Sequence, residues 1–150
     1  KLISNLPYNI SSKFLLKTIK LNKNLTDLIC MIQSELANKL DYKNGKMNKY
    51  KFISQFYSTF ESKFKVSKNV FYPKPKVQSK VIKFILNKKN IDDAKFDYFV
   101  RYFFTNKRKK IKANKELINY IDKKYLNLRF EDLEYEQILK IYHTFQFFSS

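Results

Sequence analysis

Residues 1–19, KLISNLPYNISSKFLLKTI, place a strand, a turn and a helix within one short segment. The first four residues are typical of a strand end, and Pro7 breaks that strand because proline has no backbone N–H to donate. Ser11 or Ser12 can cap the helix that follows. Its apolar side chains recur at helical spacing, as Phe14, Leu15 and Ile19. The segment therefore predicts a strand that leads directly into a helix, as in α/β folds.

Strand and helix patterns continue to alternate up to about residue 89. Apolar spacing predicts strands over residues 25–33, 60–66 and 77–86, and helices over residues 34–40 and 50–57. In the second of these strands, Phe60, Phe64 and Val66 have the alternation of one strand face. Residues 71–76, Phe-Tyr-Pro-Lys-Pro-Lys, are predicted to be an extended loop, because the prolines exclude both a helix and a central strand.

The apolar period changes after residues 87–90 and stays helical to the end of the chain. Side chains at this spacing are Phe96, Phe99, Val100, Phe103, Phe104, Leu117, Ile118, Ile121, Ile138, Leu139, Ile141 and Tyr142. We therefore expect an α/β domain over residues 1–90 and a small all-α domain over residues 91–150.

Charge is the strongest compositional signal. Of 150 residues, 31 are Lys or Arg and 13 are Asp or Glu, so the formal net charge is +18. This excess favours a nucleic-acid partner, because cations near phosphates release counterions on binding. Compositional drift in an AT-rich genome is one alternative. An anionic membrane surface is another, but the clean basic amphipathic helix that it requires is missing, and no apolar run approaches a membrane span. The single cysteine, Cys30, excludes a disulfide framework and a cysteine-based zinc site within one chain.

The turn Asn5-Leu6-Pro7-Tyr8 carries the clearest chemistry, because ligands bind beyond the carboxyl ends of strands in open α/β sheets. The Asn5 side-chain oxygen and the Leu6 carbonyl can both accept hydrogen bonds from a planar exocyclic amine held beside a methyl donor. Pro7 stiffens the turn, and Tyr8 offers a ring on which a base can stack. A purely structural turn at the strand end explains the same four residues equally well.

Further segments give this turn a context. The turn lies in residues 5–12, and the further segments follow it along the chain as residues 31–37, 71–79, 104–110 and 129–133. Together they resemble the KsgA family of ribosomal RNA adenine dimethyltransferases. The related methyltransferases that confer macrolide resistance share the first and third segments. The basic stretch 104–112 and residues 129–133 favour the KsgA family.

The resemblance implies methyl transfer from S-adenosylmethionine to the exocyclic amine of adenines near the 3′ end of small-subunit rRNA. The partner would be that rRNA or a pre-ribosomal subunit, with no membrane and no metal. The implied fold is the C-terminal half of a Rossmann-like class I methyltransferase sheet in residues 1–90, followed by an all-α RNA-binding domain in residues 91–150.

The resemblance also implies roles for individual residues. The catalytic turn would be Asn5, Leu6, Pro7 and Tyr8, with Asn5 and Pro7 also next to the donor. Tyr8 and Phe71 would form the two faces of a sandwich around the base. The residues implied in RNA binding are Lys74, Lys76, Lys107, Arg108, Lys109, Lys110 and Lys112.

The sequence departs from the family pattern in several places. Gln78 stands where Asp is usual, and Lys107 stands where Arg is usual. The Gly-rich turn that holds the donor is missing, since Gly45 is the single glycine. We therefore expect that this chain alone neither binds the donor tightly nor turns over. Residues 2–4 would then form an exposed sheet edge, which predicts either disorder there or pairing with a missing N-terminal portion or a partner chain.

Two other functions remain open at this point. One is a non-catalytic nucleic-acid-binding protein on the same fold, of the mitochondrial transcription factor type. The other is a resistance-type methyltransferase that acts on large-subunit rRNA. The retained Asn5 favours the enzyme over the first, and the basic stretch 104–112 argues against the second.

Overall fold

The computed structural model describes residues 1–7, 9–21, 24–105, 108–115 and 118–148. The chain divides into two compact units. The first consists of Lys1–Asn44 with Tyr50–Lys89, and the second of Gly45–Lys49 with Asn90–Ser150.

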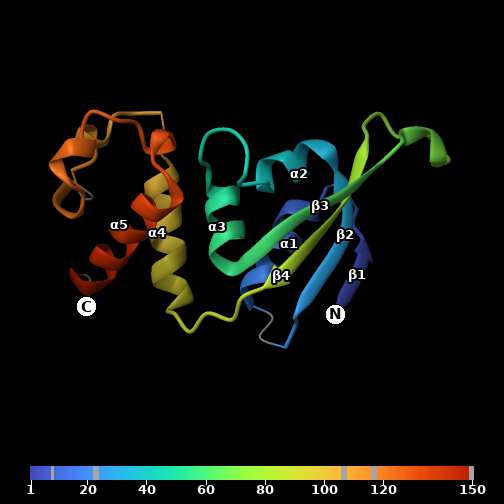
Figure 1. The fold of residues 1–150 in the computed structure, drawn as a ribbon, viewed down its shortest axis with the longest axis horizontal. Coiled ribbons are helices and arrows are strands. Elements are labelled where there is room, and N and C mark those ends of the chain that lie inside the picture. Colours follow the sequence, from blue (N-terminus) through green and yellow to red (C-terminus); the bar gives the residue numbers. More distant parts are fainter. Residues whose placement is uncertain (8, 22–23, 106–107, 116–117, 149–150) are drawn as a thin grey trace. The chain divides into compact units, whose positions relative to one another are not determined.

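The first unit is a mixed α/β structure built on a four-stranded sheet with the order β1-β2-β4-β3 (Figure 1). Its strands are β1 (Leu2–Asn5), β2 (Asp27–Gln33), β3 (Ser58–Val66) and β4 (Ser79–Leu86). Strand β1 runs parallel to β2, and β4 lies antiparallel to both β2 and β3. The helices are α1 (Ser11–Leu21), α2 (Ser34–Leu40) and α3 (Lys49–Tyr57). These elements agree with the strand, helix and loop order expected from the sequence.

One face of the sheet forms the core of this unit. Along β2, Leu28, Cys30 and Ile32 are buried, while the residues between them are half-buried. Helix α1 crosses behind the sheet in Figure 1. Burial raises the pKa of the Cys30 thiol to about 12, so this cysteine is a small buried hydrophobe and supplies no thiolate.

Strand β3 departs from the expected alternation. Phe60 is buried against Phe84, but Phe64 is 62% exposed. The register with β4 shifts between Ser62 and Phe64, so β3 contains a bulge at that point. Because side chains alternate with a period of two, one extra residue turns every later side chain to the opposite face. The prediction that Phe60 and Phe64 share one face is therefore wrong.

Strand β1 is an edge strand, as expected for residues 2–4. Within the described part of the chain it pairs with β2 alone, and the Ile3 side chain is 76% exposed. Residues 2–4 form part of a regular strand here, and the alternative of disorder stays a prediction. Pairing of this edge with a further segment or a partner chain stays a prediction.

The second unit is helical. Its long helices are α4 (Asp93–Thr105) and α5 (Tyr135–Phe148). Between them lie the short 3-10 turns η2 (Ile111–Ala113), η3 (Ile118–Tyr120), η4 (Lys123–Tyr125) and η5 (Phe130–Asp132). Aromatic side chains fill the core: Phe96 and Phe99 contact Tyr142, and Phe103 contacts Phe130.

The helical spacing at positions 117, 118 and 121 does not produce a long helix. Residues 118–120 form one 3-10 turn, and Leu117 lies outside the described residues. The Asp122 carboxylate accepts a hydrogen bond from the Lys124 N–H at 3.2 Å and starts a separate turn there. Such local bonds between a side chain and the backbone compete with helix propagation, and the apolar stripe is too short to overcome them.

Gly45–Lys49 joins the second unit through contacts that the sequence did not suggest. The Lys46 ammonium lies 2.8 Å from Asp132 Oδ1 and 3.4 Å from Glu131 Oε1. The Met47 N–H also donates to the Glu131 carbonyl at 3.2 Å. No helix in the described residues is long and apolar enough to cross a membrane.

Candidate active site and nucleic-acid interface

The turn after β1 is anchored to the sheet by Leu6. This side chain is buried, and its N–H donates to the Met31 carbonyl of β2 at 3.4 Å. Asn5 and Pro7 on either side are exposed. The turn therefore holds its backbone against the core and presents the Asn5 amide outward, at the carboxyl end of a parallel strand.

The Pro7 carbonyl is occupied by the start of α1. It accepts hydrogen bonds from the Ile10 N–H at 3.3 Å, the Ser11 N–H at 3.1 Å and the Ser11 hydroxyl at 2.7 Å. Among the described residues, none donates to the Leu6 carbonyl and none hydrogen-bonds the Asn5 side chain. In the described residues 5–7, the Asn5 amide oxygen and the Leu6 carbonyl are thus acceptors that no other described residue occupies.

The proline-rich loop reaches the same place. A hollow of about 350 Å³ is lined by Asn5, Leu6, Pro7, Met31, Phe71, Tyr72, Pro73 and Pro75. Residues 5–7 and 71–75, which are far apart in the sequence, therefore meet within the first unit. The sequence analysis expected both segments to contribute to one base-binding site. Phe71 is half-buried and Tyr72 is fully exposed. Tyr8 lies outside the described residues, so its stacking role and the sandwich with Phe71 stay predictions.

Four lining residues were missed by the sequence analysis as site residues: Met31, Tyr72, Pro73 and Pro75. Met31 pairs with Asn5 in the β1–β2 register, so a correct strand pairing would have found it. Tyr72 follows Phe71 in the loop, and no periodic pattern distinguishes the two rings.

The hollow offers acceptors and flat apolar surfaces. Of the side chains that line it, Asn5 alone carries an amide, and none carries a carboxylate, an imidazole or a thiol. No group of three or more His, Cys, Asp or Glu residues that could hold a metal occurs in the described part of the chain. The described part of this site can orient a planar amine and stack its ring.

The loop that carries Phe71 is fixed at its end by backbone contacts. The Gln78 carbonyl accepts a hydrogen bond from the Ser34 N–H at the start of α2, at 2.9 Å. The Gln78 side chain is exposed. The departure from Asp at this position therefore leaves a backbone anchor in place. Lys74 and Lys76 are exposed on either side of Pro75, beside the hollow.

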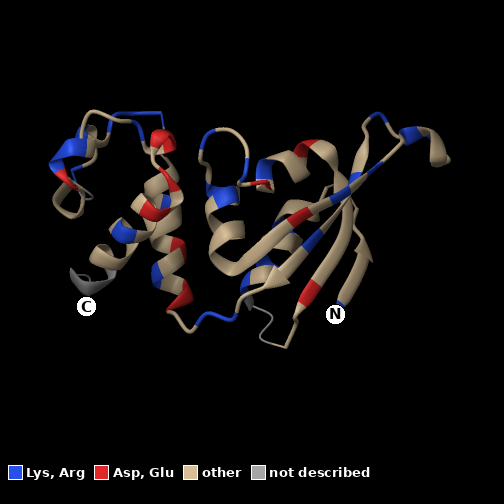
Figure 2. Ribbon diagram, in the orientation of Figure 1, with Lys and Arg blue, Asp and Glu red and all other residues tan. Residues whose placement is uncertain are grey.

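The other predicted RNA-binding residues lie in the second unit, where Lys and Arg follow α4 (Figure 2). Arg108, Lys109, Lys110 and Lys112 are exposed, whereas Ile111 between them is buried. Lys107 lies outside the described residues.

Backbone contacts bring a further cation to this stretch. Lys110 forms an antiparallel bridge with Arg129, and the Ile111 N–H donates to the Leu128 carbonyl at 2.9 Å. Arg129 is exposed. The sequence analysis did not include Arg129 among the RNA-binding residues, because only the chain pairing places it there. We call Arg108, Lys109, Lys110, Lys112 and Arg129 the basic cluster.

Comparison with known proteins identifies the family. The model of the family described as ribosomal RNA adenine dimethylase matches residues 1–148. The chain belongs to this family. The resemblance expected from the sequence is thereby confirmed.

Relatives within the ribosomal RNA adenine dimethylase family are similar over nearly the whole of this chain. The small-subunit ribosomal RNA methyltransferase A of Mycoplasma mycoides is 40% identical over 95% of the chain, and that of Borreliella burgdorferi is 38% identical over 96%. These alignments cover 59% and 55% of the two relatives. The chain is thus a homologue of small-subunit rRNA methyltransferase A that spans little more than half of its length.

Solved structures show that the fold is shared. A dimethyladenosine transferase from Plasmodium falciparum matches with a TM-score of 0.79 and 18% identity, over 93% of this chain and 65% of that one. The 23S rRNA methyltransferase ErmE matches with a TM-score of 0.70 and 18% identity, over 96% of this chain and 64% of that one. The mixed four-stranded sheet and its helices therefore have the rRNA methyltransferase architecture.

Proposed function

We propose that this chain is the base-binding and RNA-docking part of an enzyme that methylates adenine amines near the 3′ end of small-subunit rRNA. The observation that carries the proposal is the hollow in which Asn5–Pro7 and Phe71–Pro75 meet, in a member of this family. We further propose that residues 1–90 form the C-terminal half of a Rossmann-like class I methyltransferase sheet, and that residues 91–150 dock the RNA.

The available acceptors explain how the amine is oriented. The Asn5 oxygen and the Leu6 carbonyl accept the two N–H bonds of the exocyclic amine, which directs the nitrogen lone pair out of the base plane. The same two oxygens would stabilise the positive charge that develops on the nitrogen as its bond to the methyl carbon forms and the methyl–sulfur bond breaks. The thioether product would leave, and the surplus amine proton would pass to solvent. Ser11 fixes the Pro7 carbonyl and thereby the conformation of the turn. The Phe71 ring supports one face of the base, which must leave its stack to reach the hollow.

The methyl donor needs more than this chain supplies. S-adenosylmethionine provides an electrophilic methyl group on a sulfonium when it is bound. Asn5 and Pro7 fit its methyl end, since both are exposed at the hollow. The Gly-rich turn that holds the donor in this family needs several glycines, and the chain has one. The remaining donor contacts would come from the portion of the relatives that this chain does not span.

The test is a methyl-transfer assay on small-subunit rRNA. The complete protein is expected to form N6,N6-dimethyladenosine, measured by mass spectrometry of digested nucleosides, whereas this chain alone forms none. Micromolar binding of S-adenosylmethionine to this chain alone, measured by calorimetry, would contradict the division of the donor site. RNA binding by the complete protein without any methylation would instead support the non-catalytic alternative.

The basic cluster gives a separate prediction about RNA affinity. Changing Arg108, Lys109 and Lys110 together to Gln is expected to weaken binding of an rRNA hairpin. The slope of log K against log salt should fall by about 3, since each lost phosphate contact lowers it by about 0.9. Filter binding at several salt concentrations measures both quantities.

The matched control changes Lys13, Lys17 and Lys65 to Gln, which removes the same charge from exposed positions of the first unit. This variant is expected to lower the slope much less. Equal slopes for the two triple variants would show that net charge, and no particular surface, attracts the RNA.

A further inference from the structure

Aromatic rings from α4, η3 and α5 meet within the second unit. The Tyr98 ring on α4 lies nearly parallel to Tyr102, at 6.0 Å and 13°, and to Phe145 of α5, at 6.1 Å and 17°. Tyr120 of η3 stands edge-on to Phe145, at 5.5 Å and 76°. Tyr98 is 43% exposed, so part of this ring cluster faces solvent.

A hollow of about 510 Å³ opens beside these rings. It is lined by Ala94, Lys95, Tyr98, Lys115, Asn119, Tyr120 and Phe145. Among the described residues of this lining, the charged ones are Lys95 and Lys115; Glu116, next to Lys115, lies outside the described residues. The Asp92 carboxylate, directly before α4, caps this helix by accepting hydrogen bonds from the N–H groups of Ala94 and Lys95, at 2.9 and 3.1 Å. The hollow thus combines flat rings, cations and one amide.

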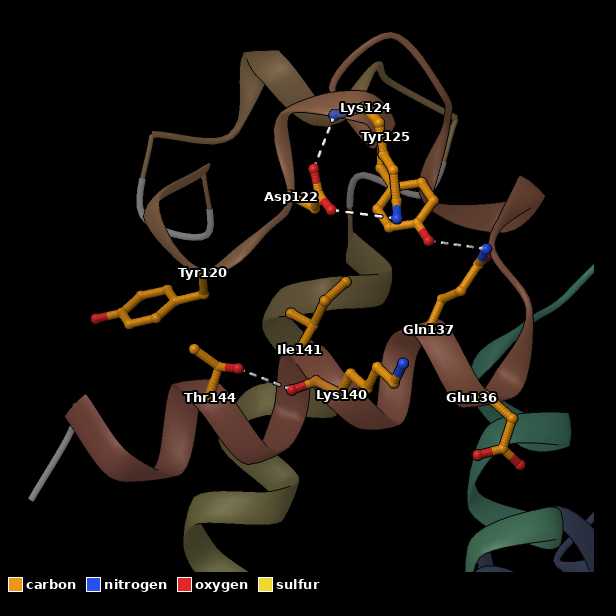
Figure 3. Close-up of a pocket in the computed structure, with 9 residues that line it drawn as sticks. All are labelled: Tyr120, Asp122, Lys124, Tyr125, Glu136, Gln137, Lys140, Ile141 and Thr144. Atoms are coloured by element: carbon orange, nitrogen blue, oxygen red, sulfur yellow. Dashed lines mark hydrogen bonds and ion pairs between the residues drawn. The ribbon is translucent and has the colours of Figure 1, made fainter.

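A second hollow of the same unit has different chemistry, although Tyr120 lines both (Figure 3). Its lining includes the acids Asp122 and Glu136 as well as Lys124 and Lys140. Asp122 and Lys124 form an ion pair at 3.2 Å, and a hydrogen bond from the Lys124 N–H lowers the pKa of Asp122. Opposite charges balance in this hollow, so it offers a polyanion no net attraction.

We propose that the hollow lined by Lys95, Tyr98 and Lys115 binds an unpaired nucleotide of the RNA. The base stacks on the exposed part of the ring cluster, the two ammonium groups face its phosphates, and the Asn119 amide lies at the base edge. The Arg101 guanidinium, 5.9 Å from the Tyr98 ring centre, adds a cation on the same helix. The inference rests on the proposed function in that RNA is the ligand.

Unpaired RNA fits this surface better than an acidic peptide or an RNA duplex. Carboxylates would pair with the lysines but would leave the flat rings unused. The bases of a duplex are stacked on one another, so they cannot also stack on Tyr98. Splayed bases of a loop or single strand use both the rings and the lysines, and aromatic rings are sequence-tolerant partners for them.

The experiment uses an unpaired oligo(A) RNA of about eight nucleotides, a length within the site size of single-strand-binding folds. It carries one 2-aminopurine, whose fluorescence is quenched when the base stacks. Binding is measured in the Arg108→Gln, Lys109→Gln, Lys110→Gln background, so that the basic cluster does not mask the hollow. Tyr98→Leu is expected to weaken binding about tenfold and to remove the quenching, without changing the salt slope.

Companion variants keep the result interpretable. Tyr98→Phe retains a ring and is expected to restore both binding and quenching. Lys95→Gln with Lys115→Gln should lower the salt slope by about 1.4, since each contact to a single strand contributes about 0.7. Tyr125→Leu with Lys124→Gln removes a ring and a lysine from the hollow of Figure 3, where acids and lysines balance. This variant is expected to leave oligo(A) binding unchanged.

The outcomes separate this inference from the proposed function. Unchanged oligo(A) binding in Tyr98→Leu overturns the inference, and so does binding of an oligoglutamate peptide in place of the RNA. If hairpin binding still depends on Arg108, Lys109 and Lys110 in that case, the proposed RNA-docking role of the second unit stands. If the unaltered protein binds neither the rRNA hairpin nor oligo(A), both proposals are contradicted.

Discussion

Asn5→Ala in the complete protein is expected to lower the rate of methyl transfer by about 100- to 1,000-fold, the range found when one preorganised polar group is removed from a site that stabilises developing charge. The RNA dissociation constant should change by less than about twofold, because Asn5 contacts the amine and no phosphate. The reason lies in the turn. With the Pro7 carbonyl occupied by Ile10 and Ser11, the Asn5 side-chain oxygen and the Leu6 carbonyl are the acceptors that the described residues 5–7 leave for the amine.

The measurement is a single-turnover rate with rRNA and donor both saturating, together with RNA affinity from filter binding. Asn9→Ala is the matched control, since Asn9 is an exposed asparagine next to the same turn. It is expected to retain the full rate. Asn5→Asp keeps an acceptor oxygen but replaces the amide NH2 with a second, negatively charged acceptor, and is expected to fall between Ala and the native residue. An Asn5→Ala rate within about threefold of the native rate would remove Asn5 from the catalytic turn and support the structural explanation of this sequence.

Local sequence patterns predicted the elements that depend on local physics. The proline at position 7 and the apolar spacing of α1 are enough to define a strand, a turn and a helix. The predicted serine cap is wrong, since Ser11 is the first residue of α1 and its hydroxyl donates to the Pro7 carbonyl. The loop over residues 71–76 is likewise determined by its prolines. The candidate site needed more, because the meeting of this loop with the Asn5 turn depends on strand order. It was expected only through the family resemblance.

Features that depend on long-range pairing escaped the sequence analysis. Arg129 joins the basic cluster through its bridge with Lys110, and no spacing in the sequence signals that pairing. Met31 enters the site through register with Asn5. The bulge in β3 is a single extra residue in one strand, and it becomes visible only against β4. In each case the deciding contact joins segments that are distant along the chain.

The bulge makes Phe60 and Phe64 a matched pair for a stability prediction. Both are phenylalanines of β3, but Phe60 is 2% exposed and Phe64 is 62% exposed. The Phe60 ring centre lies 5.4 Å from that of Phe84, and its N–H donates to the Tyr42 hydroxyl at 3.1 Å. Phe60→Ala is expected to lower the free energy of unfolding by about 3–5 kcal/mol, since it removes buried surface and leaves a cavity in a core that relaxes only in part.

Phe64→Ala should change the free energy of unfolding by less than about 0.5 kcal/mol, as is usual for exposed positions. Urea unfolding followed by circular dichroism measures both variants, and unchanged m-values would show that the same cooperative transition is being compared. If strict alternation held throughout β3, both side chains would face the core and both substitutions would be costly. A large loss for Phe64→Ala would therefore contradict the bulge, and a small loss for Phe60→Ala would contradict the assignment of the buried face. We expect the loss of unfolding free energy to be much larger for Phe60→Ala than for Phe64→Ala, because the extra residue in β3 turns Phe64 to the face opposite Phe60. The end of β3 that is turned in this way leads into the loop that carries Phe71.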